Sequence, residues 1–530
     1  MKVYVLALIL LSVIGAEVNS YKILGVLHIP SKSHYIVMNS LMRELALRGH
    51  EVTVITAFKA KSPLQNYEEI FMENSLSDAI KSVRSDNFVN LNNLPFWNRI
   101  STAYDASMNF TKFTTRNERF HSFLREDRHF DVVIANLFVG DAMMALGQYY
   151  NAPIIAFSTT IPSKWTSDLV GLSHFSSHVP NIISGFSDKM NFWERVTNSL
   201  EYWFEDIATV LYYRPKQQKL LEEYWPNKTD VPRLDQVLRN ISLVFVNSHV
   251  TLTTPQPLAP NLIEIGGIHV NQSSYSLNED VQTFLNDAKD GAIFFSLGSN
   301  IKLSKMSDRV KAIVANSFAE FPNVRILIKN EENFVIPSHK PSDVLVKPWY
   351  NQQEILSHPN LKLFCTHGGL LSTIEAVYFG KPIVGIPVFY DQHVNAKLAE
   401  FKGYGVSVPY ERLNEDNLKS AIRSVLTNPS YANTARLISG RYHSQMNSPM
   451  ETAIHWVEHI AKFKGAPHLR SAGIDQPFYV YYSLDCWSFI IFVCSLVLLI
   501  IFKTIKCVVR LFPFTKPIKA EKLKTKMKAK

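Results

Sequence analysis

Residues 364–392 read FCTHGGLLSTIEAVYFGKPIVGIPVFYDQ. An apolar run stops here at His367 and two glycines, and the apolar residues that follow have helical spacing as far as Gly380. The stretch predicts a buried strand over 361–364, a turn, and a helix over 372–379. A helix that begins at the carboxyl edge of a parallel sheet points unpaired amide groups at that edge. We therefore expect an anion such as phosphate to bind at the His-Gly-Gly turn.

Short runs rich in Val and Ile recur along the chain, and helical patterns separate them. They form two series, one at 23–27, 52–55, 132–135, 154–157 and 243–247 and another at 293–297, 324–328, 361–364 and 383–386. Such alternation is typical of doubly wound parallel sheets, and a Pro-rich stretch with Gly266 and Gly267 separates the two series. We expect an α/β fold with two Rossmann-like doubly wound domains, at 21–255 and 256–465, that face each other across a cleft.

The first twenty residues have the pattern of a secretory signal peptide, expected over 1–20. A charged start precedes an apolar run and small residues, and the sequence leaves open whether cleavage follows Ala16 or Ser20. Only Cys365 lies outside the C-terminal apolar region, so no intrachain disulfide is expected in the exported part. Four sequons are candidate glycosylation sites in that compartment: Asn109, Asn227, Asn240 and Asn271.

The C-terminal end has the pattern of a membrane anchor. A linker over 466–484 precedes a predicted transmembrane helix at 485–505 and a basic tail at 506–530. From residue 503 onward, nine Lys and one Arg stand against one Glu, and the resulting +9 equals the formal net charge of the chain. Basic residues directly after an apolar run favour a single-pass type I membrane protein over a nucleic-acid-binding domain. Lys526 and Lys528 resemble a retrieval signal of the endoplasmic reticulum, so we expect the large N-terminal part in its lumen.

Polar residues gather at the sheet edge where the His-Gly-Gly turn is expected. Glu375 lies one turn inside the predicted helix, where a carboxylate can accept hydrogen bonds from vicinal sugar hydroxyls. Asp391 and Gln392 follow the next predicted strand and reach the same edge. The ordered set of His, Gly-Gly, Ser, Glu and Asp-Gln over two successive strands predicts a site for a phosphate and a sugar.

Residues 346–395 resemble the signature of the UDP-glycosyltransferases of animals and plants, and the likeness extends over nearly the whole chain. Residues 347–360, KPWYNQQEILSHPN, resemble the Trp-x-x-Gln segment that precedes this signature. The resemblance implies a GT-B type fold with a UDP-sugar as co-substrate. It assigns Trp349 to stacking on uracil, Gln352 to the uracil edge or the ribose, His367, Gly369, Ser372 and Ser299 to the diphosphate, Glu375 to the ribose, and Asp391 with Gln392 to the hexose hydroxyls.

One position departs from the plant and vertebrate pattern, because Leu371 stands where those members usually carry Asn. That phosphate contact cannot be transferred to this chain. The sequence LLS around it is closest to invertebrate members, which favours glucose as the sugar. Glucuronic acid, galactose and xylose remain open.

Transfer from a UDP-sugar needs a base for the proton of the acceptor and a positive potential for the departing diphosphate. The sequence has no Asp-x-Asp pair to hold a divalent metal, so we expect no metal or other cofactor, with the helix terminus and His367 supplying the potential. His34 occupies the place of the family's catalytic histidine. The family's usual Asp partner is Asn136 here, and Asp141 is the alternative partner. The sequence does not decide between the two.

Two functions stand at this point. The first is inverting transfer of a hexose from a UDP-sugar to hydroxyl groups of small lipophilic acceptors. The second is a membrane-anchored binding protein for nucleotide-sugars or lipophiles with weak or no turnover. The intact donor set favours the first, and Asn136 is the feature that supports the second. The acceptor and the oligomeric state cannot be predicted, and no nucleic-acid partner is expected.

Overall fold

The computed structural model describes residues 20–60, 62–73, 94–138, 140–270, 278–299 and 301–511. The predicted signal peptide, the sequon at Asn271 and the end of the basic tail lie outside these residues. The chain divides into two compact units, unit 1 up to Ile474 and unit 2 from Asp475 onward. Both sheets and the candidate site belong to unit 1.

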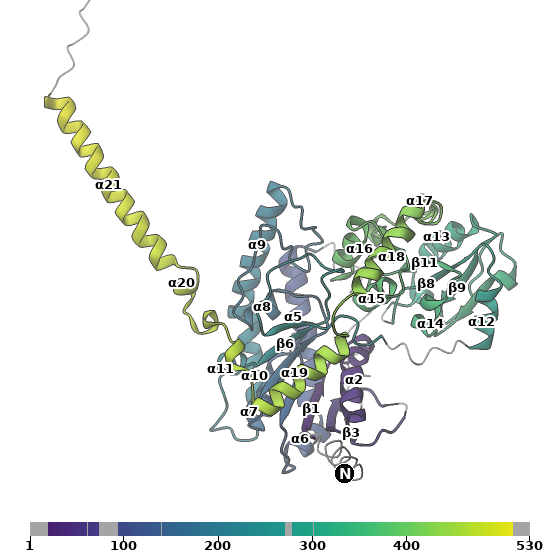
Figure 1. The fold of residues 1–530 in the computed structure, drawn as a ribbon, viewed down its shortest axis with the longest axis horizontal. Helices are drawn as coiled ribbons and strands as arrows, with labels where there is room; N and C mark the ends of the chain where they lie inside the picture. The colour runs from purple at the N-terminus through teal and green to yellow at the C-terminus, as the bar shows by residue number, and fades with distance from the viewer. Residues whose placement is uncertain are drawn as a thin grey trace, which may run out of the picture. The chain divides into compact units, whose positions relative to one another are not determined.

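The first sheet of unit 1 contains seven parallel strands in the order β3-β2-β1-β4-β5-β6-β7. These strands are β1 (Lys22–Leu27), β2 (Glu51–Thr56), β3 (Tyr67–Phe71), β4 (Val132–Asn136), β5 (Ile154–Ser158), β6 (Leu243–Val246) and β7 (Leu262–Glu264). Figure 1 labels β1, β3 and β6 of this sheet. All residues of β4, β5 and β6 are buried, because helices cover both faces of a parallel sheet.

The second sheet contains six parallel strands in the order β10-β9-β8-β11-β12-β13. They are β8 (Ala292–Ser296), β9 (Arg325–Lys329), β10 (Val344–Lys347), β11 (Leu361–Thr366), β12 (Ile383–Gly385) and β13 (Gly405–Ser407). The predicted fold of two doubly wound, Rossmann-like sheets is confirmed. In each sheet the order reverses beside the first strand of the series, which is where ligands of such sheets bind.

Helices connect the strands. Those that follow the strands of the first sheet are α2 (Lys32–Leu47), α5 (Phe96–Thr115), α6 (Glu118–Leu124), η2 (Asp141–Met144), α7 (Ala145–Tyr149), α8 (Lys164–Asp168), α9 (Phe192–Ala208), the π-helix η3 (Thr209–Tyr213), α10 (Arg214–Tyr224) and α11 (Leu234–Arg239). Those of the second half are α12 (Glu279–Asn286), η5 (Leu303–Lys305), α13 (Asp308–Ala319), η6 (Pro341–Asp343), α14 (Gln352–Ser357), α15 (Leu370–Tyr378), α16 (Gln392–Phe401), η7 (Tyr410–Arg412), α17 (Glu415–Thr427), α18 (Pro429–His443), α19 (Pro449–Phe463), η8 (Pro467–Leu469) and η9 (Ala472–Asp475).

The helix ends follow from local sequence. α15 begins directly after Gly369, and its C-terminal end is followed by Gly380 at φ +62°, a backbone conformation that glycine adopts without strain. α2 is likewise followed by Gly49 at φ +96°. The predicted strand-turn-helix around the His-Gly-Gly sequence is therefore present.

Two segments differ from the predicted division at 255 and 465. β7 pairs with β6, so the first sheet extends beyond residue 255. α19 lies near the end of the predicted second domain, yet Ile454, Val457 and Ile460 belong to the same buried core as Ile23 of β1. The N-terminal domain therefore recruits a helix from the far end of unit 1.

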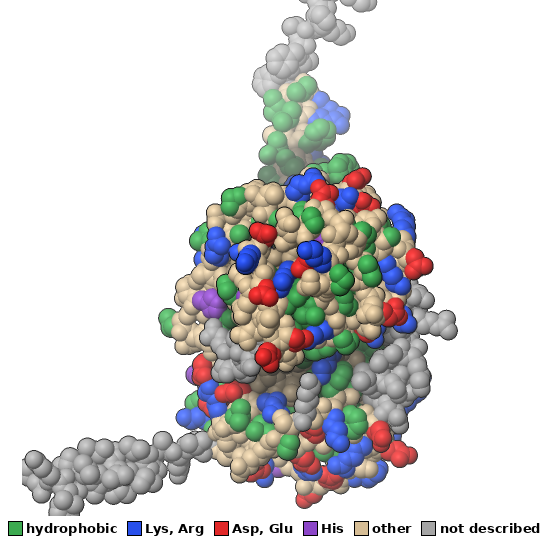
Figure 2. All heavy atoms as spheres, turned by 90° about the vertical axis from the view of Figure 1, so that its right-hand side faces the viewer, with side chains coloured by type: hydrophobic (Ala, Val, Ile, Leu, Met, Phe, Trp, Pro, Cys, Tyr) green, Lys and Arg blue, Asp and Glu red, His purple; other side chains and the backbone are tan. Residues whose placement is uncertain are grey.

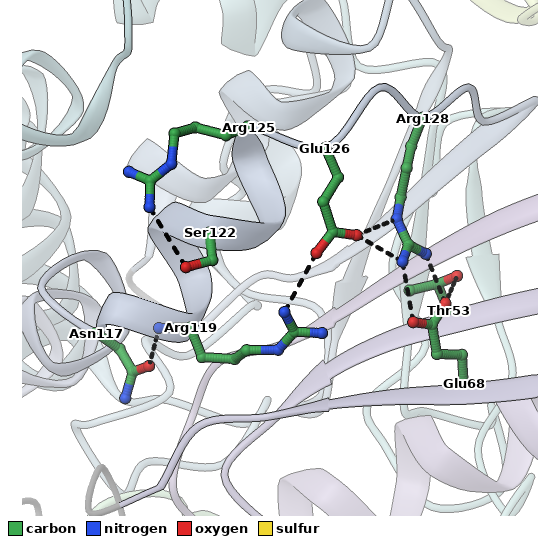
Figure 3. Close-up of polar contacts among 8 residues, drawn as sticks. All are labelled: Thr53, Glu68, Asn117, Arg119, Ser122, Arg125, Glu126 and Arg128. Carbon is green, nitrogen blue, oxygen red and sulfur yellow. Dashed lines mark hydrogen bonds and ion pairs between the residues drawn. The ribbon is translucent and has the colours of Figure 1, made fainter.

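A network of charged side chains holds the edge of the first sheet (Figure 3). The guanidinium of Arg128 donates to Glu68 of β3 at 2.5 and 3.0 Å and to Glu126 at 2.7 Å. Arg119 of α6 donates to the other oxygen of Glu126 at 3.2 Å. Because Ile70 is the one fully buried residue of β3, these bidentate contacts supplement the packing of an edge strand.

Unit 2 contains α20 (Phe478–Tyr481) and α21 (Leu484–Leu511), a helix of 28 residues. Among the described residues, α21 is the one helix long and apolar enough to cross a membrane. By contrast, the face of the molecule drawn in Figure 2 carries basic and acidic side chains mixed together.

Candidate active site

A cavity of about 1400 Å³ lies at the carboxyl ends of the strands of both sheets, where the topology predicts ligand binding. The donor residues expected from the sequence all line it: Ser299, Trp349, Gln352, His367, Gly369, Ser372, Glu375, Asp391 and Gln392. His34 lines the same cavity from the first sheet. Asp141 is not among the lining residues.

His367 lies against two glycines. A Cβ atom at Gly298 would lie 2.4 Å from His367 Cε1, and one at Gly369 would lie 2.5 Å from Nε2. Gly298 also has φ +79°, a conformation that side chains rarely adopt. Both positions therefore need glycine for the ring to approach the two backbone segments. The first amides of α15 have no side-chain cap and remain available for an anion.

Lys329 supplies the positive charge near this turn. It is the last residue of β9, and its ammonium donates to the carbonyl of Gly298 at 2.7 Å. Burial, aided by the charge of Lys329, lowers the pKa of His367 to about 4. His367 is therefore neutral at pH 7 in this structure. The potential at the turn comes from Lys329 and the helix terminus, and His367 contributes as a neutral hydrogen-bonding group.

Trp349 is 55% exposed and offers a ring surface to the cavity. The ammonium of Lys329 lies 4.2 Å from the centre of this ring, within the range of a cation–π interaction. The contact joins the end of β9 to the segment that leads into α14.

Glu375 is buried, and neighbouring side chains orient its carboxylate. Gln352 Nε2 donates to Glu375 Oε2 at 2.5 Å and to Ser372 Oγ at 3.0 Å. Gln353 Nε2 donates to Glu375 Oε1 at 3.1 Å, and His269 Nε2 lies 3.2 Å from the same oxygen. The predicted donor residues Gln352, Ser372 and Glu375 thus form one connected group.

Asp391 is bound to the His-Gly-Gly turn through Asn395. The Asn395 amide donates to Asp391 Oδ2 at 2.9 Å and to the carbonyl of Gly368 at 3.0 Å. Burial raises the pKa of Asp391 to about 6. The preceding residue, Tyr390, has φ +51°, and such strain in a non-glycine residue often occurs at functional sites.

Gln392 orders the loop that carries Asp391. Its Oε1 accepts hydrogen bonds from the amides of Val388 at 2.9 Å and Phe389 at 3.2 Å. Because Oε1 already accepts these two hydrogen bonds, Gln392 would contact a ligand through its Nε2 amide group, as a donor.

His34 lies in the first turn of α2, where Nδ1 is 2.7 Å from the hydroxyl of Thr159. The ring of Phe138 packs edge-on at 4.7 Å. Burial lowers the pKa of His34 to about 4. The side chain of Asn136 lies beside the ring and partly offsets this lowering of the pKa. The Oδ1 atom of Asn136 has no hydrogen-bond partner among the described residues. His34 is thus neutral at pH 7.

Asp141 lies in η2, with Tyr213 and Arg214 as its neighbours. Its amide donates to the hydroxyl of Tyr213 at 3.4 Å. Burial raises the pKa of Asp141 to about 6, and the charge of Arg214 partly offsets this effect. Within the described residues no hydrogen bond joins Asp141 to His34. The pairing of Asp141 with His34 stays a prediction without a supporting contact.

The part of the cavity that surrounds His34 is mainly apolar. The N-terminal domain contributes these apolar lining side chains: Ile29, Ile36, Phe58, Ala103, Ala106, Phe110, Phe138, Trp165, Ile182 and Ile183. Polar residues of the same domain also line the cavity: Ser31, Lys32, Ser33, Ser107, Thr159 and Thr160. An apolar lining with polar groups among it suits a lipophilic ligand that carries a hydroxyl group.

Thr159 and Lys329 are among the lining residues that sequence reasoning did not single out. Each is a polar residue at the carboxyl end of an apolar strand, since Thr159 follows β5 and Lys329 ends β9. A polar residue at the end of an apolar strand could therefore have been recognised in the sequence as a candidate lining residue. In the part of the chain that the structure describes, no group of three or more His, Cys, Asp or Glu side chains is arranged to hold a metal ion.

Comparisons with known proteins identify the family of the chain. The family model described as "UDP-glucoronosyl and UDP-glucosyl transferase" matches residues 25–522. The chain is 32% identical to UDP-glycosyltransferase UGT5 of Dactylopius coccus, over 93% of each chain. It is 29% identical to human UDP-glucuronosyltransferase 2B15, over 89% of this chain and 90% of the relative.

Solved structures share the fold. The calicheamicin glycosyltransferase CalG4 aligns with a TM-score of 0.55 at 14% identity, over 84% of this chain and 99% of that one. Os79 from O. sativa, solved in complex with UDP, aligns with a TM-score of 0.51 at 15% identity, over 83% and 99%. From the family match and the curated relatives, we conclude that the chain belongs to the UDP-glucuronosyl and UDP-glucosyl transferase family, enzymes that transfer a sugar from a UDP-sugar.

Proposed function

We propose that this chain transfers a hexose, with glucose favoured, to hydroxyl groups of small lipophilic acceptors, and that the anomeric configuration is inverted. The observation that carries the proposal is the shared cavity, which is lined by His34, by apolar side chains and by the expected donor residues. The preference for glucose rests on the likeness to invertebrate sequences around Leu371.

His34 acts as the general base in this proposal. A base near neutral pH must be unprotonated, and the lowered pKa of His34 meets that need. If Nδ1 carries the proton and donates it to Thr159, then Nε2 is free to accept the acceptor's proton. Asn136 beside the ring stabilises the imidazolium less than a carboxylate does, so we expect slower turnover than an Asp partner gives.

The donor half binds UDP and the sugar as the sequence suggests. Trp349 stacks on the uracil, Gln352 and Glu375 hold the nucleoside, and the amides after Gly369 receive the diphosphate. Lys329 adds positive charge to the departing UDP. Asp391 and Gln392 bind hexose hydroxyls.

Inversion follows from a single displacement. The acceptor oxygen, losing its proton to His34, attacks the anomeric carbon as its bond to the diphosphate breaks. Retention through a covalent intermediate needs a carboxylate nucleophile near that carbon. The carboxylates among the described lining residues are Glu375 and Asp391, both of which the proposal uses for binding the donor.

The test uses the detergent-solubilised full chain, several UDP-sugars and a panel of phenols and steroids. We expect acceptor-dependent release of UDP, fastest with UDP-glucose, and a β-configured product by NMR from the α-configured donor. UDP binding without acceptor-dependent release for any donor would support the binding protein instead. An α-configured product would exclude inversion.

We further propose a single-pass type I placement in the membrane of the endoplasmic reticulum, with the catalytic part in the lumen. α21 and the basic tail support it. Glycosidase sensitivity of the full chain, compared with a variant carrying Lys526→Ser and Lys528→Ser, tests both points. Absence of N-glycans on Asn227 and Asn240, which are exposed in the structure, would contradict the lumenal placement.

A further inference from the structure

Helix α9 is labelled in Figure 1, and the π-helix η3 follows it. In an ordinary surface helix the outward face is polar and the inward face apolar, whereas α9 and η3 show the reverse pattern. Their outward face is apolar, and its members are exposed by 36% to 75%: Phe192, Trp193, Leu200, Trp203, Phe204, Ile207, Val210 and Leu211. The spacing 193, 200, 203, 207 and 211 places most of them on one stripe of the helix. Exposed apolar surface on this scale marks a contact site.

The inward face of the same helix is polar. Asn198 is fully buried, and its side chain accepts from the amide of Asn181 at 2.8 Å. Glu205 is 2% exposed and accepts from the Asn181 amide group at 2.7 Å. Asp206 pairs with the buried ammonium of Lys164. Of the ionisable groups of α9, Glu201 and Glu205 are therefore buried, whereas Glu194, Arg195 and Asp206 are partly exposed.

Neighbouring residues extend the apolar face. The ring of Phe96, at the start of α5, lies 6.1 Å from that of Phe204, and the adjacent Trp97 is 56% exposed. Trp and Phe side chains are favoured where protein meets the headgroup region of a bilayer. If α9 lay parallel to a bilayer with this face toward the lipid, its apolar side chains would insert into the headgroup region.

The position of the chain's exit from unit 1 favours lipid as the occupant. A Cβ atom at Gly171 would lie 2.9 Å from Ile474, so the end of unit 1 packs beside the segment that follows α8. α8 carries Lys164, which pairs with α9. Residues 475–483 then lead into α21 and, fully extended, reach no further than about 35 Å. An anchored chain therefore keeps this side of unit 1 within reach of the membrane.

We propose that the apolar face of α9 and η3 is a second membrane contact, in which unit 1 rests on the bilayer that α21 spans. The proposal goes beyond sugar transfer and rests on the proposed anchoring, not on the identity of donor or acceptor. It gives unit 1 an affinity for lipid that does not depend on the covalent connection to α21.

The experiment separates this contact from the anchor. A site for a specific protease is inserted after Asp475 in the full chain, which is reconstituted into phosphatidylcholine and phosphatidylethanolamine vesicles. After cleavage, we expect unit 1 to sediment with the vesicles in low and in high salt. The triple variant Leu200→Ser, Trp203→Ser and Ile207→Ser should bind vesicles at least about tenfold more weakly, because three apolar side chains are lost.

A matched control replaces equally exposed apolar residues elsewhere: Val335→Ser, Leu437→Ser and Phe463→Ser. This variant should stay with the vesicles. UDP binding serves as the folding control for both. Should the triple variant fail to fold, a fluorophore on Leu200→Cys should shift its emission on adding vesicles, while one on Leu437→Cys should not; Cys365, the other cysteine of unit 1, is buried.

Release of wild-type unit 1 on cleavage overturns the proposal. So does equal retention of the triple-serine variant, or an unshifted fluorophore at position 200. If released wild-type unit 1 sediments as a dimer and the triple-serine variant as a monomer, the face joins two copies of this chain, and the lipid contact is rejected.

Discussion

The ammonium of Lys329 lies 4.2 Å from the centre of the Trp349 ring while it donates to the carbonyl of Gly298. One side chain thereby links the expected uracil platform to the loop beside His367. Lys329→Met should weaken UDP binding about 2- to 30-fold, the range of a cation–π contact, as measured by calorimetry. Lys329→Arg, which keeps the charge, should retain most of the affinity.

The Trp349→Ala variant measures how much of the UDP affinity depends on the Trp349 ring, and the effect of Lys329→Met is compared with it. It should lose about tenfold or more in UDP affinity, since base stacking contributes about 1–3 kcal/mol in nucleic-acid complexes. If Lys329 acts on UDP binding through the Trp349 ring, the double variant should lose little more, whereas a charge that acts directly on the diphosphate should add its own loss. Full additivity of the two losses would show that Lys329 works independently of Trp349.

Replacing the proposed base should separate catalysis from donor binding. His34→Ala should reduce turnover about a hundredfold to ten-thousandfold, the usual worth of a general base, and leave UDP affinity nearly unchanged. Initial rates of UDP release and a UDP titration measure the two quantities. Turnover above a tenth of the wild-type rate would exclude His34 as the base.

The partner of His34 can be identified by two single substitutions. If Asn136 is the partner, Asn136→Asp should raise turnover and raise the pKa of His34, because a carboxylate stabilises the imidazolium. Asp141→Asn should then change turnover little, since its neighbours are Tyr213 and Arg214. A large loss in Asp141→Asn that disappears in the background of His34→Ala would reverse this assignment.

Gly298 and Gly403 offer a matched test of the loop that holds His367. Both have φ +79°, but a Cβ at Gly298 would lie 2.4 Å from the His367 ring, whereas at Gly403 the nearest atom is 3.9 Å away. Both alanine variants should lose stability through backbone strain. Only Gly298→Ala should also lose UDP affinity, because His367 must move. Equal UDP affinity in the two variants would contradict this role of Gly298.

Buried His28 should make stability depend on pH. Burial lowers the pKa of His28 from its ordinary 6.5 to about 3, and the backbone of Val26 only partly offsets this effect. Between these values the unfolded chain binds the proton more readily, so the free energy of unfolding should fall as the pH drops below 6.5. His28→Leu should remove about 1.4 kcal/mol per pH unit of this dependence in urea titrations. An unchanged slope would show that His28 is not the group responsible.

The central strands could be predicted from sequence, and the edge strands could not. Residues such as those of β5 are buried on both faces, so they form an unbroken apolar run. β3 and β10 lie at the edges of their sheets and contain exposed or half-buried residues, including Glu68 and Lys347. The pairing of these edge strands depends on partner strands that are distant in sequence. The sequence pattern alone therefore did not predict β3 and β10.

The predicted donor residues line one cavity because they follow one another at successive strand ends of one sheet. Lys329 was missed because its role depends on Trp349, which is twenty residues away and on another segment. The contact of α19 with the first sheet was missed for a similar reason, since helical periodicity identifies an apolar face but not the surface it covers.

The return of α19 to the first sheet sets an order for folding during synthesis. Its residues fill the core around β1 and α2, and Arg48 and His50 bind Glu451 and Glu458 of this helix. Domains usually fold in the order in which they leave the ribosome. Here the first domain cannot close its core until residues 449–463 have been made, by which time the second sheet is complete. The N-terminal domain begins first and finishes last, so a nascent chain that stalls within the second sheet exposes the apolar surface that α19 should cover.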